Sequence, residues 1–150
     1  MKKLLMFSII IASLSSCDKT KHKVEYKFDF KLTNAGADYA LDNFYTTSEG
    51  VDVKLESLRF YLAHVIFIND DNEEVTATDI ELITFGSSGT ASVSFEIPVD
   101  NYSKIQFGIG VPAAMNEADP ATYNTTAGHP LNGTNNTYWG WAAMYRFVII

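Results

Sequence analysis

Hydrophobic and polar side chains alternate along much of the chain, a pattern typical of strands with one buried and one solvated face. The clearest case is residues 24–32, where apolar residues hold the even positions and charged residues the odd ones. Residues 58–68 are largely apolar on both faces, which predicts a central strand covered on both sides. Further strands are expected at residues 51–55, 75–85, 92–97, 105–111 and 145–150.

Turn-forming residues separate these runs at short intervals. The chain is therefore predicted to be all-β, with an antiparallel β-sandwich of the Ig-like type. Residues 34–50 are expected to be loop-like. Residues 112–137 are rich in Pro, Asn, Thr and Gly and are expected to form long loops at one end, with a short helical turn at 113–118. No turn residue closes the apolar run 145–150, so we expect C-terminal strands of this domain to be missing from the sequence.

The first residues have the features of an export signal. Lys2 and Lys3 precede an apolar run at residues 4–14, which is too short to span a bilayer as a helix. Leu-Ser-Ser-Cys at residues 14–17 is similar to the lipobox of bacterial lipoproteins, in which the signal is cut before the cysteine and the cysteine is acylated. We therefore predict a signal peptide and a lipid anchor on Cys17.

The predicted organisation is a signal peptide at residues 1–16, a lipidated Cys17 with a tether at 17–23, and one β-sandwich domain at 24–150. Cleavage removes two lysines, so the formal charge goes from −7 to −9 when the new amino group is acylated. A chain this acidic is a poor partner for nucleic acid or anionic lipid surfaces, so the acyl chains would supply the membrane attachment. The single Cys excludes an intrachain disulfide.

No catalytic motif stands out in the sequence, and no enzyme activity is predicted. Two histidines are candidates for metal ligands. His64 lies within the most apolar strand and by period two shares a face with Phe60, Leu62 and Ile66, so it is either a core histidine or an imidazole ligand. His129 precedes a proline, which holds its backbone extended and suits a ligand or a plain turn equally.

Several other residues offer weaker chemistry. Met115 and Met144 are candidate soft thioether ligands, with core packing as the alternative. Tyr138, Trp139 and Trp141 are expected to form an aromatic wall, which would pack in a core or stack on a sugar.

Two polar segments also contain side chains that can bind cations. The acidic turn at residues 70–74 offers oxygen ligands for Ca²⁺ or forms a solvated hairpin tip. His22 lies in the tether and is expected to be solvated.

Taken together, the order and spacing of several segments resemble the MbnP-like domain family, which is named for a periplasmic protein encoded beside methanobactin genes. The resemblance covers residues 24–150. Its segments are Leu58 to Ala63, Tyr102-x-x-Ile105-x-Phe107-Gly108-Ile109-Gly110-Val111-Pro112, Met115-Asn116 with Asp119-Pro120, His129-Pro130-Leu131-Asn132, and Tyr138-Trp139-Gly140-Trp141 with Tyr145-Arg146-Phe147.

The resemblance implies an exported β-sandwich with a mononuclear copper site. In that family the ligands are histidines and a kynurenine, which a partner di-haem oxidase makes from a tryptophan. His64 and His129 are the positions to which the histidine ligands carry over. The family pattern has the tryptophan two residues before a ligand histidine, where this chain has Leu62, so the kynurenine does not carry over.

The leading hypothesis is a copper carrier or buffer, lipid-anchored in the cell envelope of a Gram-negative bacterium and held at the outer membrane. The alternative is a metal-free envelope module that recognises glycan or protein through its aromatic residues. A hydrolase would need a nucleophile next to His64 or His129, and the sequence identifies none.

Overall fold

The computed structural model describes residues 22–140 and 142–150. The predicted signal peptide, Cys17 with its predicted lipid anchor, and Trp141 lie outside the described residues. None of the helices within these two ranges is long and apolar enough to cross a membrane.

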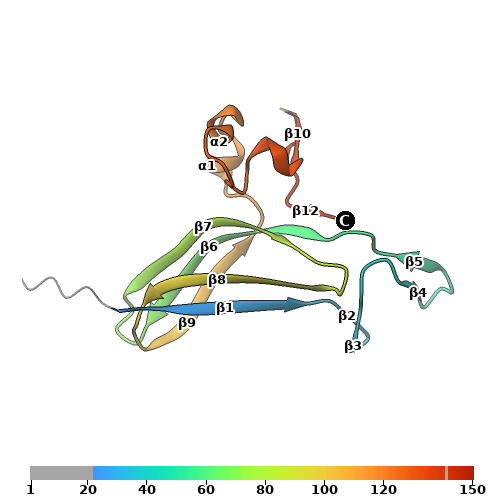
Figure 1. The fold of residues 1–150 in the computed structure, drawn as a ribbon, viewed down its shortest axis with the longest axis horizontal. Helices are drawn as coiled ribbons and strands as arrows, with labels where there is room; N and C mark the ends of the chain where they lie inside the picture. The colour runs from blue at the N-terminus through green and yellow to red at the C-terminus, as the bar shows by residue number, and fades with distance from the viewer. Residues whose placement is uncertain (1–21, 141) are drawn as a thin grey trace, which may run out of the picture.

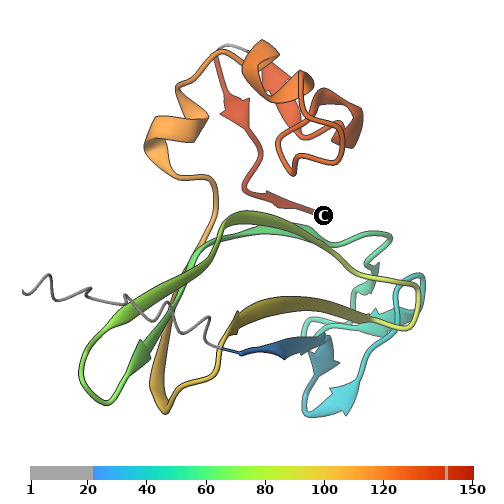
Figure 2. The ribbon, with the colours of Figure 1, turned by 60° about the vertical axis from the view of Figure 1, so that its left-hand side comes forward.

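Two antiparallel sheets face each other, which confirms the predicted all-β sandwich (Figures 1 and 2). In the larger sheet, β6 (Arg59–Asn69) is central and has β7 (Glu74–Thr84) on one side. On its other side lie β9 (Tyr102–Ile109) and β12 (Val148–Ile149). The smaller sheet contains β1 (Lys23–Lys31) and β8 (Thr90–Pro98).

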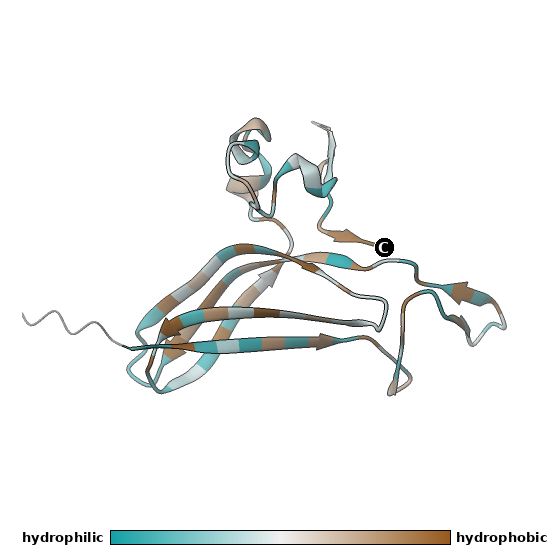
Figure 3. Ribbon diagram, viewed as in Figure 1, coloured by the Kyte–Doolittle hydropathy of each residue, from teal (hydrophilic) through white to brown (hydrophobic). Residues whose placement is uncertain are grey.

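The core between the two sheets consists of apolar side chains from every second position of the strands. Figure 3 shows hydrophobic positions alternating with hydrophilic ones along β1. The apolar side chains of β1 pack against buried residues of the larger sheet. The rings of β1 pack directly on β6: Tyr26 lies 5.0 Å from Phe67, and Phe30 lies 5.5 Å from Phe60, between ring centroids. The inner core, as we call this cluster, buries only apolar side chains, which are Leu41, Leu62, Val65, Phe67, Ile83, Phe85, Phe95 and Ile97.

The region predicted to be loop-like at residues 34–50 is partly built of short strands. A tight hairpin joins β2 (Thr33–Asn34) to β3 (Ala37–Asp38). A second hairpin joins β4 (Phe44–Thr46) to β5 (Asp52–Lys54), the latter lying within the strand predicted at 51–55. Strands of two or three residues are too short to show a period, so the sequence pattern could not predict the first hairpin.

The edge of the larger sheet is interrupted by a long excursion. Both β9 and β12 run antiparallel to β6 and lie along the same side of it. At Tyr61 the two segments meet, because the Gly110 N–H donates to the Tyr61 carbonyl (2.8 Å) and the Tyr61 N–H donates to the Phe147 carbonyl (3.2 Å). Residues 111–146 therefore leave and rejoin one edge strand, and we call them the lobe.

The lobe covers the outer face of β6 and β7, on the side away from β1 and β8 (Figures 1 and 2). It holds short elements only, so the predicted strand at 145–150 is split in two: β11 closes the lobe and β12 rejoins the sheet. The elements of the lobe are α1 (Ala113–Asn116), α2 (Ala121–Asn124), η1 (Gly133–Asn135), β10 (Tyr138–Gly140) and β11 (Met144–Tyr145).

Candidate functional site

His64 sits on a β-bulge and not in the core. Between Ala63 and Ile66 the register of β6 slips by one residue against β9, and His64 has a left-handed φ of 48°. Because of the bulge, Val65 points into the inner core, where a strictly alternating strand would have placed the side chain of His64. The prediction that His64 shares the face of Phe60 and Leu62 is thus wrong, and its side chain is exposed.

A bulge of this kind redirects a side chain, and bulges are frequent beside functional sites. A left-handed backbone costs a non-glycine residue energy, although His tolerates it better than most residues do. Here the bulge presents the imidazole at a surface hollow of about 160 Å³, lined by Ala63, His64 and residues 108–112. The hollow lies where β9 ends and the lobe begins.

His129 lies inside the lobe and is partly buried. Its ring stacks on Tyr123 with 4.8 Å between centroids and 20° between planes. Its Nδ1 accepts a hydrogen bond from the Leu131 N–H (3.1 Å), and its carbonyl accepts one from the Asn132 N–H (2.9 Å). The side chain and backbone of His129 both help to shape the turn at residues 129–132.

The Nδ1 contact limits how His129 can bind a metal. A neutral imidazole that accepts at Nδ1 carries its proton on Nε2, and a protonated Nε2 has no lone pair for a metal. Ligation through Nε2 would require the proton to move to Nδ1, where it would face the donor N–H of Leu131. His129 therefore fits a ligand role only after its ring turns away from Leu131, whereas His64 is accessible as it stands.

A cluster of tyrosines holds the lobe on the sheet. Tyr61 of β6 is fully buried, and its hydroxyl donates to the Pro130 carbonyl (3.1 Å) and lies 2.6 Å from the Thr137 hydroxyl. The Tyr145 hydroxyl donates to the Leu131 carbonyl (2.9 Å). These bonds fix the backbone that follows His129, at Pro130 and Leu131.

Burial changes the acidity of two of these tyrosines. Burial, more than any charge, raises the pKa of Tyr145 to about 12, and neighbouring tyrosines add to the shift. Burial likewise raises the pKa of Tyr61, partly offset by its hydrogen bond with Thr137. Both hydroxyls are therefore neutral donors at physiological pH.

Neither methionine is brought to a histidine by the contacts of the described residues. Met115 packs against the cluster beneath the lobe, together with Tyr138, Tyr123 and Leu82. Met144 is partly buried in β11, with a left-handed φ of 56°. Packing thus accounts for the position of Met115.

The aromatic wall divides between inside and outside. Tyr138 packs on Tyr145 with centroids 5.0 Å apart. Of the two alternatives for Trp139, core packing is wrong, because the side chain is 74% exposed. The Arg146 guanidinium lies 5.7 Å from its ring centroid. An exposed indole with a cation near one face is available for contact with a partner.

The acidic turn is organised by a buried asparagine. The Asn69 Oδ1 accepts from the N–H groups of Asp71 (3.0 Å) and Glu73 (2.8 Å). Its Nδ2 donates to the carboxylates of Glu73 and Asp100, both at 3.1 Å. This arrangement favours the solvated hairpin tip between β6 and β7, because the side-chain amide shapes the turn by itself.

No group of three or more His, Cys, Asp and Glu side chains within residues 22–140 and 142–150 is placed to share a metal. Sequence reasoning missed the roles of Tyr61, Tyr123 and Tyr145. The one sequence signal for these roles was the residue type, because a purely apolar core would contain phenylalanine at such positions. A buried Tyr hydroxyl usually has a hydrogen-bond partner.

Comparisons with known proteins agree on one family. A family model described as MbnP matches residues 21–150. Among solved structures, the fold is similar to that of MbnP from Methylosinus trichosporium, with a TM-score of 0.59 and 16% sequence identity. The match covers 84% of this chain and 53% of the solved one, so this chain spans about half the length of that protein. Among curated proteins, none matches the sequence.

Proposed function

Because this chain belongs to the MbnP family, we propose that it is an exported copper-binding lipoprotein that carries or buffers copper in the cell envelope. The family is associated with methanobactin systems, which supports an extracytoplasmic, copper-related role. The anchor would be the acylated Cys17, held at the outer membrane of a Gram-negative cell.

The exposure of His64 is the observation that carries this proposal. A histidine in the middle of the most buried strand would normally be enclosed, yet the bulge turns it out toward a hollow. An accessible neutral imidazole is a good ligand for copper. We assign His64 as the first ligand.

His129 is the second ligand in this proposal, after its ring leaves the Leu131 N–H. Copper binding would then compete with a hydrogen bond that shapes the lobe. Met115 and Met144 remain candidates for a soft third ligand. Leu62 is 1% exposed and stands where the family pattern has the tryptophan, so a di-haem oxidase partner would find no tryptophan to modify at that place.

The test is copper retention by residues 18–150, which lack the signal and the anchor cysteine. After loading with Cu(I) or Cu(II) and desalting, we expect one copper per chain for the wild type. His64→Ala and His129→Ala should each abolish stoichiometric retention. His22→Ala is the matched control, since His22 is exposed and outside the site, and it should bind as the wild type does. Wild-type binding by the His64 and His129 variants would show the assignment to be wrong.

A second function, metal-free recognition of a glycan or protein, is favoured by one observation: Trp139 is largely exposed on the lobe. An indole face of this kind stacks on sugars and contacts protein partners. If it acts in this way, Trp139 fluorescence should change with a bound sugar in protein stripped of metal, and Trp139→Ala should abolish binding while leaving copper retention unaffected.

A further inference from the structure

The two arginines of the chain, Arg59 and Arg146, meet at one turn of the lobe, beside the exposed indole of Trp139. The Arg59 Nη1 donates to the Asn135 carbonyl (2.8 Å), and the Arg146 Nη2 donates to the Asn136 carbonyl. The Arg146 guanidinium also lies 5.7 Å from the centroid of the Trp139 ring. The fold thus gathers two guanidiniums from β6 and from the end of the lobe at the turn that follows η1.

No acidic side chain of the described ranges neutralises this pair of charges. Neither Arg59 nor Arg146 has a carboxylate partner within residues 22–140 and 142–150, although the chain has 18 acidic residues against 11 basic ones. The Arg146 Nε is buried and has no hydrogen-bond partner among the same residues. Because buried donors are nearly always paired, an unpaired guanidinium nitrogen calls for a partner.

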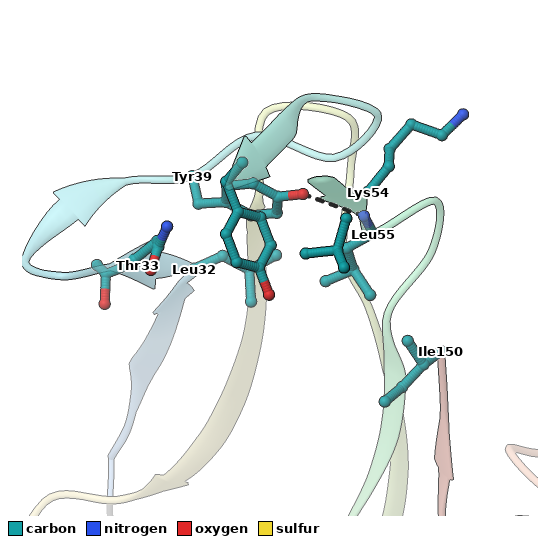
Figure 4. A pocket seen from close by; sticks show the side chains of 9 residues that line it. Leu32, Thr33, Tyr39, Lys54, Leu55 and Ile150 are labelled. Carbon is teal, nitrogen blue, oxygen red and sulfur yellow. Dashed lines mark hydrogen bonds between the residues drawn. The ribbon is translucent and has the colours of Figure 1, made fainter. Parts of the chain in front are cut away.

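Another cation beside an exposed aromatic ring shows the contrast. The Lys54 Nζ lies 5.8 Å from the centroid of Phe44, whose side chain is 71% exposed. Lys54 is paired with the carboxylates of Glu56 (2.6 Å) and Asp42 (3.7 Å). Figure 4 shows its ammonium directed away from the neighbouring hollow of about 410 Å³. The charge beside Trp139 has no such carboxylates in the described part of the chain and is available to a ligand.

The groups on this surface match the chemistry of an acidic sugar. A guanidinium binds a carboxylate through two parallel hydrogen bonds, and an indole offers a flat apolar face to the C–H groups of a sugar ring. The Asn136 side chain is exposed, and its amide makes no hydrogen bond within the described residues. An amide both donates and accepts, so it suits the hydroxyl groups of a sugar.

The overall charge of the chain argues for a ligand with isolated carboxylates. The formal charge is −7, so the acidic surface around the two arginines repels a dense polyanion such as nucleic acid or a run of acidic residues. A sugar ring that bears one carboxylate meets little of this repulsion, because the rest of the ring is neutral.

We propose that Trp139, Arg146 and Arg59 bind a carboxylate-bearing sugar, a uronic-acid residue of a glycan. The Trp139 indole stacks on the sugar ring, Arg146 binds the carboxylate, and Arg59 adds a second positive charge. This inference rests on the second function proposed above, recognition through Trp139, and names the class of ligand.

The test titrates the exported protein, from residue 18 onward and stripped of copper, with methyl β-D-glucuronide and methyl β-D-glucoside. The two glycosides differ only in a carboxylate that replaces a hydroxymethyl group. Chemical shifts of the indole N–H groups in NMR spectra report the binding. We expect the glucuronide to bind at least about 10-fold more tightly, because a charge-assisted hydrogen-bonded pair is worth about that factor or more. Added salt should reduce the preference.

Variants separate the two parts of the surface. Trp139→Ala should abolish binding of both glycosides, whereas Arg146→Gln should reduce the affinity for the glucuronide to that for the glucoside. If Arg146→Gln fails to fold, Arg146→Lys should still lower the glucuronide affinity at least about threefold, because an ammonium cannot form the two parallel bonds. Lys54→Gln, at the neutralised cation beside Phe44, is the matched control and should bind as the wild type does.

Equal affinity of the wild type for the two glycosides would overturn the assignment of the carboxylate, and the second function would still stand if Trp139→Ala lost that binding. Failure of both glycosides to bind would overturn the second function as well. Competition by hexaglutamate as strong as that by the glucuronide would also overturn the proposal, because an acidic peptide would then be the ligand. Copper retention is measured separately, so its failure is a distinct outcome.

Discussion

The two faces of the larger sheet are covered in different ways. On the inner face, the cluster that meets β1 and β8 buries only apolar side chains. On the outer face, the cluster that meets the lobe is built around tyrosines, and the buried hydroxyls of Tyr61 and Tyr145 bond to backbone carbonyls of the lobe.

The difference follows from what each face must satisfy. The strands of the inner face pair their backbone groups with each other, so their side chains need only exclude water. The lobe has little regular structure, so its carbonyls require other donors, and tyrosine hydroxyls on the sheet supply them. Packing on the inner face consequently depends mainly on the volume of its side chains. Packing on the outer face depends on the geometry of the tyrosine hydrogen bonds to the lobe.

The largest expected effect concerns volume on the inner face. Phe67→Ala should lower the free energy of unfolding by about 3–5 kcal/mol, because Phe67 is fully buried and its loss leaves a cavity. Phe107→Ala, on the neighbouring strand but half exposed in residues 22–150, is the matched control and should cost about 1 kcal/mol or less. Denaturant unfolding of a protein that contains residues 22–150 measures both free energies. Equal losses of stability in Phe67→Ala and Phe107→Ala would mean that burial on the inner face does not set the cost.

A smaller effect is expected from one hydroxyl on the outer face. Tyr61→Phe keeps the ring but removes the donor to Pro130 and the partner of Thr137, so it should cost about 1–3 kcal/mol. Because these contacts hold the lobe, hydrogen exchange should increase in residues 129–137 more than in β1 or β8. An equal increase in hydrogen exchange in residues 129–137 and in β1 and β8 would mean that the Tyr61 hydroxyl does not hold the lobe specifically.

Alkaline pH should weaken the outer face selectively. The pKa of Tyr145 is raised to about 12 from its ordinary value of 10, so the folded state holds this proton more tightly than the unfolded state does. The resulting stability is complete below pH 10 and is lost as the pH rises toward 12. Denaturant midpoints across this range should fall for the wild type and fall less for Tyr145→Phe. If the denaturant midpoints of the wild type and of Tyr145→Phe fell equally with pH, the alkaline loss of stability would not be due to Tyr145.

The smallest expected effect is at the junction of lobe and sheet. Gly110 and Gly140 both have a positive φ, 122° and 136°, so an alanine is strained at either place. Only at Gly110 would the new Cβ press on a neighbour, the Phe147 ring at 3.2 Å. Gly110→Ala should therefore lower the free energy of unfolding by about 1 kcal/mol more than Gly140→Ala does. The difference is no larger because the Phe147 ring is partly exposed and can move away. Thermal unfolding of the two variants compares them directly, and equal costs would mean that Phe147 does not hold this junction.

Most of the sandwich was predictable from the sequence. Residues 24–32, 58–68 and 75–85 correspond closely to β1, β6 and β7, because alternation records the environment of each side chain locally. The short helical turn at 113–118 was also found, as α1. The short strands β2, β3 and β4 and the division of 145–150 into β11 and β12 were not predicted, because strands of two or three residues carry no readable period.

The candidate site was less predictable. Both histidines were identified as candidates by residue type, but their surroundings were not. His64 is exposed because β6 bulges against β9, and that mismatch depends on a strand some 40 residues away. The Nδ1 contact of His129 and the exposure of Trp139 depend on how the lobe folds over the sheet.

The sequence alone thus determined the strands, the sandwich class and the family resemblance, since these depend on local periodicity and on residues in order along the chain. Only the tertiary structure decided which side chains are open to a ligand. The direction of a side chain depends on register between distant strands and on hydrogen bonds across the lobe, and a single-residue slip is enough to move a histidine from the core to the surface.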